Sequence, residues 1–360
     1  MPVLCPKHRV AWLACLALLA GAAPAAADPL EDFYRGKQLR IIVRAEPGGN
    51  YDIYSRLLMR HMVKYIPGKP VAIPMNMPGG SGLTALNYVT QVAPHDGTVL
   101  TIVTQTFPVE QALGLNKNLK VDVRKLNWIG NMSESNTFLL TSQKSATRTI
   151  EDAKRRETIM AVPSTADVTA WLTAVLNNTL GTKFTLVAGY PSGPAMNLAM
   201  ERGEVEGRGT TNPRTMFTGV AAEAGSGAFH LLLQSGRHKE KDYPEVPLIV
   251  DLAENPDQRL VFDYFSKMGS LARPVAMAEG VPADRVRMMR SAFVKTMQDP
   301  EFVADARQQQ SEIAMMTGEE LQQVVKDIVD APSTVIEHVR QAIQVKGAKQ
   351  ITSKAPADGK

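Results

Sequence analysis

Residues 39–65 have the sequence LRIIVRAEPGGNYDIYSRLLMRHMVKY. The first seven of these residues are mostly apolar and predict a buried strand. A loop at 46–50 follows, after which apolar residues recur at helical spacing. Tyr54, Leu57 and Leu58 begin this series, and His61 lies on the same helix face. The stretch therefore predicts a strand, a glycine loop and a helix, with His61 as a packed side chain.

The same strand, loop and helix unit recurs three more times along the chain. Its strands are expected at 71–77, 158–162 and 184–188, each followed by a loop rich in Gly, Pro, Ser or Thr. Strands that alternate with helices predict parallel sheets covered by helices, which is an α/β fold. Ligands of such sheets bind where loops leave the carboxyl ends of the strands. Near the C-terminus, residues 317–320 fit a capping box at the start of a further helix.

The N-terminus predicts a cleaved secretory signal peptide. Residues 7–9 are basic, residues 10–22 are almost wholly apolar, and small residues stand at Ala25 and Ala27. This three-part pattern places cleavage after Ala27. The apolar run is shorter than the about 20 residues that a membrane-spanning helix needs. The cleaved leader predicts export to the periplasm, and a lipoprotein signal at Cys15 is the alternative.

Composition excludes several classes of function. Both cysteines, Cys5 and Cys15, lie in the leader, so the mature chain has no disulfide and no thiol site. The chain has 40 Lys and Arg against 36 Asp and Glu, and removal of Lys7 and Arg9 leaves it near neutrality. No nucleic acid partner is therefore expected. No window after the leader is apolar enough for a transmembrane helix.

No enzyme motif is present in the sequence. The six histidines lack the close spacing of a zinc site, so no metal is expected. The phosphate-binding pattern G-x-x-x-x-G-K-[ST], the nucleophile pattern G-x-S-x-G and the dinucleotide pattern G-x-G-x-x-G are all missing. The sequence therefore predicts neither a cofactor nor catalysis.

The glycine loops instead predict an anion-binding site. Gly48 and Gly49 stand between a strand end and a helix start, where glycine lets the backbone approach a ligand. The first N–H groups of the following helix, backed by the helix dipole, attract negative charge. The loops at 79–82, 164–165 and 192–193 repeat the arrangement. Four such loops facing one cleft predict a receptor for a small organic anion, a carboxylate or dicarboxylate.

Five segments resemble those of a known family in the same order. Residues 47–56, PGGNYDIYSR, resemble the P-G-G-x-x-D-x-x-x-R motif of the Bug family, the receptors of tripartite tricarboxylate transporters. Residues 76–82, NMPGGSG, resemble its N-x-P-G-x-x-G loop, and residues 94–100, PHDGTVL, resemble its P-x-D-G-x-x-L turn. Residues 189–205 and 280–283 resemble later segments. The chain departs from the family pattern at Met77, where Arg or Lys is usual, and at the strand 206–210.

The resemblance implies a type II periplasmic-binding-protein fold, with two α/β lobes that close over a carboxylate. Lobe 1 is expected at 28–130 plus 238–345, lobe 2 at 131–237, the signal peptide at 1–27 and a flexible tail at 346–360. The implied partners are membrane permease subunits, and the receptor is expected to be a monomer. Two alternatives remain: an exported ligand sensor for a membrane kinase, and a secreted hydrolase.

Individual residues receive roles from their place in these loops. The predicted ligand-binding residues are Gly48, Gly49, Asn50, Gly79, Gly80, Ser81, Ser164, Thr165, Asp167 and Arg208. Arg208 is the predicted cation near the cleft, and its alternative is a surface ion pair with Glu204 or Glu206. Asp52 and Arg56 are expected to fix the first loop rather than to contact the ligand.

Overall fold

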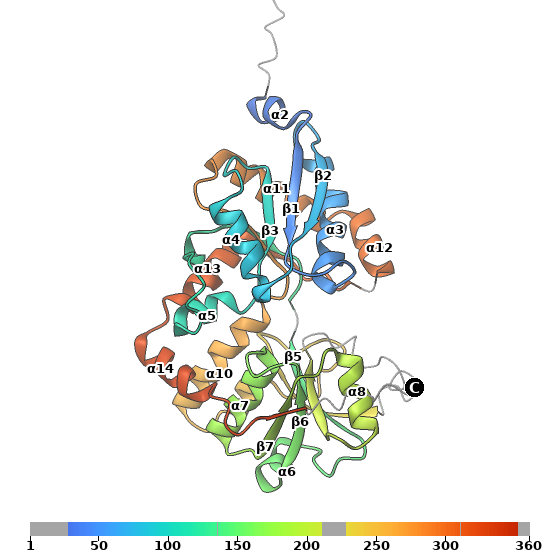
Figure 1. The fold of residues 1–360 in the computed structure, drawn as a ribbon, viewed down its shortest axis with the longest axis vertical. Coiled ribbons are helices and arrows are strands. Elements are labelled where there is room, and N and C mark those ends of the chain that lie inside the picture. Colours follow the sequence, from blue (N-terminus) through green and yellow to red (C-terminus); the bar gives the residue numbers. More distant parts are fainter. Residues whose placement is uncertain (1–27, 135, 211–227, 310, 352–360) are drawn as a thin grey trace, which may run out of the picture.

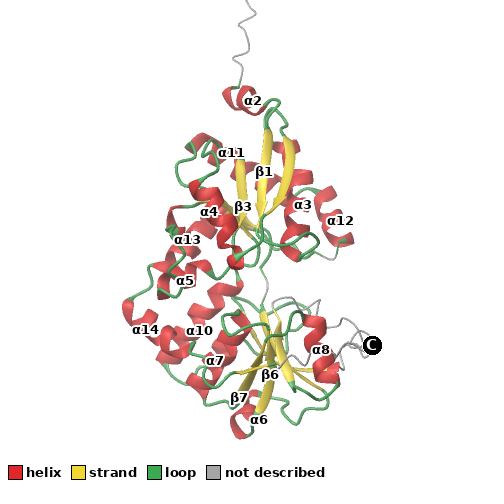
Figure 2. Ribbon diagram, viewed as in Figure 1, coloured by secondary structure: helices red, strands yellow, loops and turns green. Residues whose placement is uncertain are grey.

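The computed structural model describes residues 28–134, 136–210, 228–309 and 311–351. The predicted signal peptide at 1–27 lies outside the described residues. Two six-stranded sheets lie one above the other along the long axis of the molecule (Figure 1), and helices flank each sheet (Figure 2). Within the described residues, no helix has both the length and the apolar character needed to cross a membrane.

The sheet of lobe 1 has the strand order β11-β4-β10-β3-β1-β2. Its strands are β1 (Gln38–Val43), β2 (Val71–Asn76), β3 (Val99–Ile102), β4 (Asn127–Asn131), β10 (Pro274–Met277) and β11 (Met316–Thr317). β1 pairs in parallel with β2 and β3, and Val43 lies opposite both Asn76 and Ile102. The carboxyl ends of these three strands therefore meet at one edge. β10 is antiparallel to β3 and β4, so β10 begins at that same edge.

Helices cover both faces of this sheet. They are α2 (Pro29–Tyr34), α3 (Asn50–Met62), α4 (Leu83–Gln91), α5 (Phe107–Leu113), α11 (Ala283–Met297), α12 (Pro300–Gln308) and α13 (Gly318–Val329), with short 3-10 turns η2 (Val63–Tyr65), η3 (Gly80–Gly82) and η4 (Val123–Lys125). Successive side chains of a strand point to opposite faces. Ile41 and Val43 accordingly pack in the core formed with α3 and α11, whereas Ile42 packs against α4.

The sheet of lobe 2 has the order β12-β7-β6-β8-β5-β9. Its strands are β5 (Thr137–Ser142), β6 (Thr158–Val162), β7 (Phe184–Ala188), β8 (Gly207–Thr210), β9 (Phe229–Ser235) and β12 (Lys349–Gln350), and its helices are α6 (Ile150–Arg155), α7 (Val168–Leu180) and α8 (Gly193–Glu201). β6 and β7 match the predicted strands at 158–162 and 184–188. α7 covers one face, packing with Met160, and α8 covers the other, packing with Ala161.

The chain crosses between the lobes three times. It passes from β4 to β5, from β9 through η7 (Ile249–Leu252) and α10 (Pro256–Gly269) to β10, and from α13 through α14 (Ser333–Ala342) to β12. α10 packs against α14 and β9. These two helices were expected in lobe 1 with residues 238–345. They pack against α7 and β9 of lobe 2 (Figure 1), and they also contact α5 and α13 of lobe 1. Helical periodicity shows which face of a helix is buried, not which lobe buries it.

The predicted flexible tail at 346–360 is corrected in part. Lys349 and Gln350 pair in parallel with Val187 and Ala188 of β7. The amide of Ile351 donates a hydrogen bond to the carbonyl of Ala188 at 2.9 Å. This segment therefore adds an edge strand to lobe 2, and residues 352–360 lie outside the described residues.

Asn131 ties two of the crossing segments together. Its side-chain amide nitrogen donates to the carbonyls of Ser133 and Ser270, both at 2.7 Å. Its side-chain oxygen accepts a hydrogen bond from the backbone N–H of Arg273 at 2.8 Å. Because Asn131 is fully buried, these bonds fix where Arg273 stands at the edge of the lobe 1 sheet.

The predicted capping box at 317–320 is confirmed at the start of α13. The Thr317 hydroxyl accepts from the Glu320 amide, and the Glu320 carboxylate accepts from the Thr317 amide at 2.9 Å.

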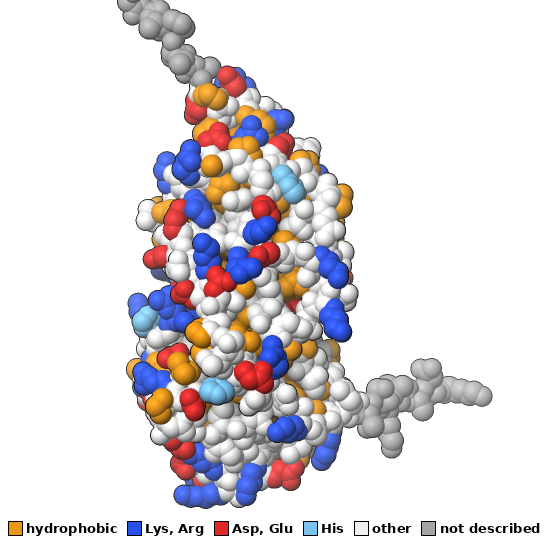
Figure 3. Space-filling view, turned by 90° about the vertical axis from the view of Figure 1, so that its left-hand side faces the viewer, with side chains coloured by type: hydrophobic (Ala, Val, Ile, Leu, Met, Phe, Trp, Pro, Cys, Tyr) orange, Lys and Arg blue, Asp and Glu red, His pale blue; other side chains and the backbone are white. Residues whose placement is uncertain are grey.

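Basic and acidic side chains intermix on the face of the molecule drawn in Figure 3.

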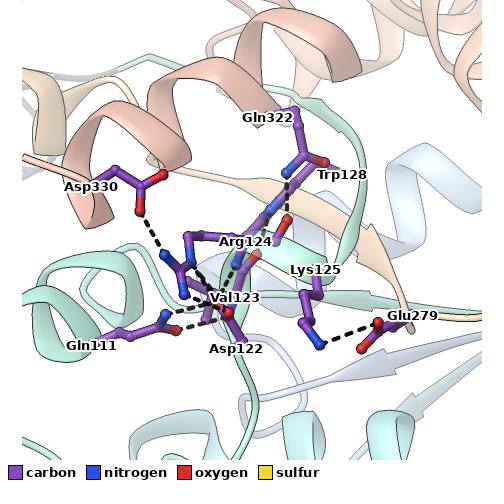
Figure 4. A network of polar contacts seen from close by, with 9 residues as sticks. All are labelled: Gln111, Asp122, Val123, Arg124, Lys125, Trp128, Glu279, Gln322 and Asp330. Carbon is purple, nitrogen blue, oxygen red and sulfur yellow. Dashed lines mark hydrogen bonds and ion pairs between the residues drawn. The ribbon is translucent and has the colours of Figure 1, made fainter.

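A polar network joins α5, η4 and the end of α13 (Figure 4). The Arg124 guanidinium pairs with Asp122 at 2.7 Å and with Asp330 at 2.6 Å. Gln322 donates to the Arg124 carbonyl at 2.8 Å, and Gln111 donates to Asp122 at 2.7 Å. The network therefore anchors the end of α13, from which the chain continues into α14 and towards lobe 2.

Replacement of Arg124 by alanine is expected to lower the melting temperature by about 1–3 °C, because exposed ion pairs contribute little individually. Hydrogen bonds from Arg124 and its charge hold the pKa of Asp122 well below its usual range. The Arg124 contribution should therefore be present at neutral pH and lost as the pH falls far enough to protonate Asp122. Calorimetric melting of both proteins at neutral and acidic pH measures this. An equal difference at every pH would contradict it.

Candidate functional site

A cavity of about 770 Å³ lies between the two lobes, and we call it the inter-lobe cavity. Its volume falls within the range of small-molecule sites. Both lobes supply its walls, from loops that leave the carboxyl ends of β1, β2, β3, β6 and β7. The lining residues are Arg44, Asn50, Tyr51, Gly80, Ser81, Thr104, Gln105, Thr106, Glu110, Leu115, Asn116, Ser164, Ala166, Asp167, Val168, Trp171, Pro191 and Arg273.

The first glycine loop places one of its three predicted residues on the cavity. Asn50, the first residue of α3, lines the cavity, whereas Gly48 and Gly49 do not. The Gly48 amide donates to the Asp52 carboxylate at 2.8 Å, and the Gly49 amide donates to the Glu46 carbonyl at 3.2 Å. Both predicted donors are thus bonded within the loop. These bonds shape the loop. Gly48 has a φ of 81°, a backbone conformation that glycine adopts readily.

Asp52 and Arg56 brace this loop, as predicted. The Arg56 Nε donates to both Asp52 oxygens at 2.9 Å. Asn76, at the end of β2, donates from its side-chain amide to Asp52 and to the Ala45 carbonyl, both at 2.8 Å. Burial alone would raise the pKa of Asp52, but hydrogen bonds from Arg56, the Gly48 amide and Asn76 outweigh it and lower that pKa. The charged carboxylate is therefore the form that holds the loop.

Replacement of Asp52 by asparagine is expected to destabilise the protein by about 1–3 kcal/mol, because bonds to a charged acceptor are lost. A carboxyl group with a depressed folded-state pKa contributes stability above its unfolded pKa and loses it as the pH falls through the folded value. The difference between wild type and variant should thus shrink below a pH of about 4. Urea unfolding across this pH range tests it. A difference that grew on acidification would contradict the brace.

The second glycine loop places Gly80 and Ser81 on the cavity and leaves Gly79 off it. Ser81 has a φ of 54°, which is unusual for a residue with a side chain. The Thr104 hydroxyl, at the end of β3, donates to the Ser81 carbonyl at 2.8 Å and holds the loop in this shape. Gly82 approaches Thr104 and Arg44 so closely that a Cβ there would lie 2.4 Å from the Thr104 hydroxyl.

The loops of lobe 2 place Ser164 and Asp167 on the cavity, and Thr165 off it. Asp167 is the N-cap of α7: its Oδ1 accepts from the Thr169 amide at 2.9 Å and from the Thr169 hydroxyl at 2.6 Å. Ser192 caps α8 in the same way, accepting from the Ala195 amide at 3.3 Å. These helix starts are thus occupied by their own side chains.

Arg208 does not line the inter-lobe cavity. It lies in β8 and is 1% exposed, beneath the start of α8. Its Nε donates to the Asn197 side chain at 2.7 Å, and its Nη1 donates to the Gly209 carbonyl at 3.1 Å. Burial lowers the pKa of Arg208 to about 10.

The alternative prediction for Arg208, a surface ion pair with Glu204 or Glu206, is wrong, because Arg208 is buried. Glu206 pairs with Arg156 at 2.7 Å, and Glu204 lies 3.8 Å from Arg202.

Two arginines line the cavity instead, and neither was among the predicted ligand-binding residues. Arg44 directly follows β1, and Arg273 directly precedes β10. The Arg44 guanidinium carbon lies 4.3 Å from the centroid of the Tyr51 ring, and that of Arg273 lies 4.8 Å from it. The sequence could have indicated Arg44, because it stands at the carboxyl end of a predicted strand, where ligands bind. Arg273 reaches the same edge only because β10 runs antiparallel, which its sequence does not show.

A cluster of possible metal ligands lies apart from this cavity. His61, Asp299 and Glu301 hold ligand atoms within 4.8 Å of one another. The Lys64 ammonium contacts Asp299 and lies 2.9 Å from Glu301. His61 itself bonds to Asp305 at 3.0 Å, consistent with the predicted packed role. The Lys64 ammonium thus already balances the negative charge of Asp299 and Glu301.

Comparison with known proteins identifies similar sequences and folds. The model of the family described as tripartite tricarboxylate transporter family receptor matches residues 55–340. A TctC solute-binding protein from Polaromonas, solved without ligand, is 17% identical with a TM-score of 0.66, covering 86% of this chain and 99% of that chain. No curated protein matches the sequence.

Two solved structures with ligands also share the fold. A protein of R. palustris with adipate is 17% identical with a TM-score of 0.60, covering 84% of this chain and 97% of that chain. MatC from Rhodopseudomonas palustris with bound malate is 18% identical with a TM-score of 0.58, covering 84% of this chain and 99% of that chain. At these identities the likeness shows the two-lobed fold, which confirms the predicted fold class.

Proposed function

The chain belongs to the tripartite tricarboxylate transporter receptor family, and we propose that it captures a small organic carboxylate in its inter-lobe cavity, in the periplasm. The captured ligand is then delivered to membrane permease subunits. The observation that carries the proposal is the cavity itself. It is walled by strand-end loops of both lobes and lined by two arginines.

The walls of the cavity support an organic anion as the ligand. Arg44 and Arg273 supply positive charge, and Ser81, Thr104 and Ser164 supply hydroxyl groups. Trp171 offers an apolar surface from lobe 2. Two proteins of similar fold were solved with adipate and with malate, which are carboxylates of a size that such a cavity accommodates.

The connections between the lobes support capture by closure. The lobes are joined by three crossings, and the Asn131 hydrogen bonds hold two of these crossings together. Domain closure of this kind uses a few residues between elements as a hinge. Release to a permease needs only the reverse motion, so we propose a binding cycle without chemical turnover and a monomeric receptor.

The proposal is tested by thermal denaturation of the chain from residue 28 onward with adipate, malate, citrate, benzoate and, as a cationic control without a carboxylate, putrescine. A ligand present at 100 times its dissociation constant stabilises the native state by about 2.7 kcal/mol. At least one carboxylate should therefore raise the melting temperature by several degrees, and putrescine should not. If no acid raised it, or if putrescine raised it most, the proposal would be wrong.

A further inference from the structure

Arg44, Tyr51 and Arg273 of lobe 1 stand together on the wall of the inter-lobe cavity, and we name them the arginine clamp. We propose that the arginine clamp holds the anionic head group of the ligand. The inference rests on the proposed function and deepens it. It assigns the charge recognition to side chains of one lobe, rather than to backbone amides shared between the two lobes.

Both guanidinium groups lie against the same ring, that of Tyr51. Their distances of 4.3 and 4.8 Å from the Tyr51 ring centroid place their central carbons within about 9 Å of each other. Arg273 also lies 5.0 Å from the Tyr54 ring. Aromatic faces attract cations and so partly offset the repulsion between these like charges. An anion between or beside them would remove the repulsion, and the cavity is the space available to it.

Each arginine retains a buried donor without an acceptor. Among the described residues, neither the Arg44 Nε nor the Arg273 Nε has a hydrogen-bond partner, although both atoms are buried. Arg273 is 8% exposed, and its Nη1 donates to the Ala272 carbonyl at 2.6 Å. Buried donors are normally bonded in folded proteins. The planar guanidinium fits the two oxygens of a carboxylate, so a carboxylate in the cavity would pair with the guanidinium groups that line it.

The acids of the cavity are already engaged elsewhere. Both oxygens of Glu110, on α5, accept hydrogen bonds: one from the Thr106 hydroxyl at 2.6 Å and one from the Asn116 amide at 2.7 Å. Asp167 caps α7 in lobe 2. In the part of the chain that the structure describes, neither acid forms an ion pair with Arg44 or Arg273. The positive charge of the clamp is therefore available to a ligand.

The helix starts reinforce this asymmetry between the lobes. In lobe 1, the N-cap residues of α3 and α4 are Gly49 and Gly82, which offer no side-chain cap. In lobe 2, Asp167 and Ser192 cap α7 and α8 themselves. The positive end of the α4 dipole thus adds to the clamp in lobe 1, whereas carboxylates already stand in the first turn of α3, at Asp52, and at the start of α7. The head group accordingly docks on lobe 1, and lobe 2 closes over the remainder of the ligand.

The test is isothermal calorimetry of adipate, malate, citrate and benzoate with wild type and with Arg44→Gln and Arg273→Gln. Arg60→Gln is the matched control, because Arg60 belongs to lobe 1 and pairs with Asp305 away from the cavity. Each clamp variant should bind the tightest acid of this panel at least tenfold more weakly, since bonds to a charged group are lost. Arg273→Lys should recover part of the affinity, because it keeps the charge without the planar fork. The control should match wild type.

Melting temperatures without ligand separate this role from a structural one. Because the clamp brings two like charges together, the glutamine variants should melt at or above the wild-type temperature. Unchanged affinity with a lowered melting temperature would assign the arginines to stability and overturn the inference. If wild type bound none of the four acids, the proposed function would fail first, and the clamp with it. Binding to wild type and both glutamine variants alike would overturn the clamp alone.

Discussion

Replacement of Gly82 by alanine is expected to weaken carboxylate binding by at least a hundredfold. Gly82 has a φ of 104°, which residues with a Cβ rarely adopt. A Cβ there would lie 2.4 Å from the Thr104 hydroxyl and 2.8 Å from the Arg44 Nε. The loop or these two side chains must then move. Movement breaks the bond from Thr104 to Ser81 and displaces Arg44 from the cavity wall.

Gly181 provides the matched control for this substitution. It ends α7 with a φ of 71°, and an added Cβ would meet no atom within 4 Å. Gly181→Ala therefore carries a similar backbone penalty, about 1–3 kcal/mol, without touching the cavity. Calorimetric titration of the panel acids into both variants measures the contrast. Equal affinities in Gly82→Ala and Gly181→Ala would show that the glycine loop does not shape the binding site.

Replacement of Gly130 by alanine is expected to destabilise lobe 1 by about 2–3 kcal/mol, through overpacking. Gly130 lies in β4, and a Cβ there would lie 2.2 Å from a carbon of the Phe293 ring. Phe293, on α11, is fully buried, so the ring has no free space into which to move. Strand β4 also leads into the first crossing between the lobes, so its displacement should reach the cavity.

A double substitution shows whether this contact is the cause. Phe293→Leu shortens the side chain opposite Gly130, so Gly130→Ala should cost less in that background than in wild type. Gly193→Ala is the control, because an added Cβ there meets its nearest neighbour, Arg208, at an ordinary 3.8 Å. Urea unfolding of the four proteins of the cycle and of the control gives the energies. Additive effects of the two substitutions would contradict the proposed clash.

Local pattern was sufficient to predict most of the scaffold. Apolar runs gave the strands at 158–162 and 184–188, and helical spacing gave α3 and α7. The roles of Asp52 and Arg56 were also predictable, because a carboxylate in the first turn of a helix stabilises the loop before it. These features depend on residues close together in sequence, where spacing fixes geometry.

Which hydrogen-bond donors reach the cavity depended on tertiary contacts, and the spacing of residues along the sequence does not determine these contacts. The Gly48 amide stands in the predicted loop, but the Asp52 side chain accepts its hydrogen bond before a ligand can. Arg208 precedes Gly209 in β8, and Gly209 faces Thr169 of α7, so the Arg208 side chain points to the opposite face, beneath α8. Arg273 enters the site through the antiparallel direction of β10. Each outcome follows from tertiary pairing, which one sequence does not display.

The most direct test is a crystal structure of the protein with the panel acid that binds most tightly. We expect closed lobes, with a carboxylate of the ligand bonded to Arg44 and Arg273 and the remainder against Ser164 and Trp171. Electron density for the acid outside the inter-lobe cavity would contradict the proposed function, and density inside it with neither arginine in contact would contradict the arginine clamp.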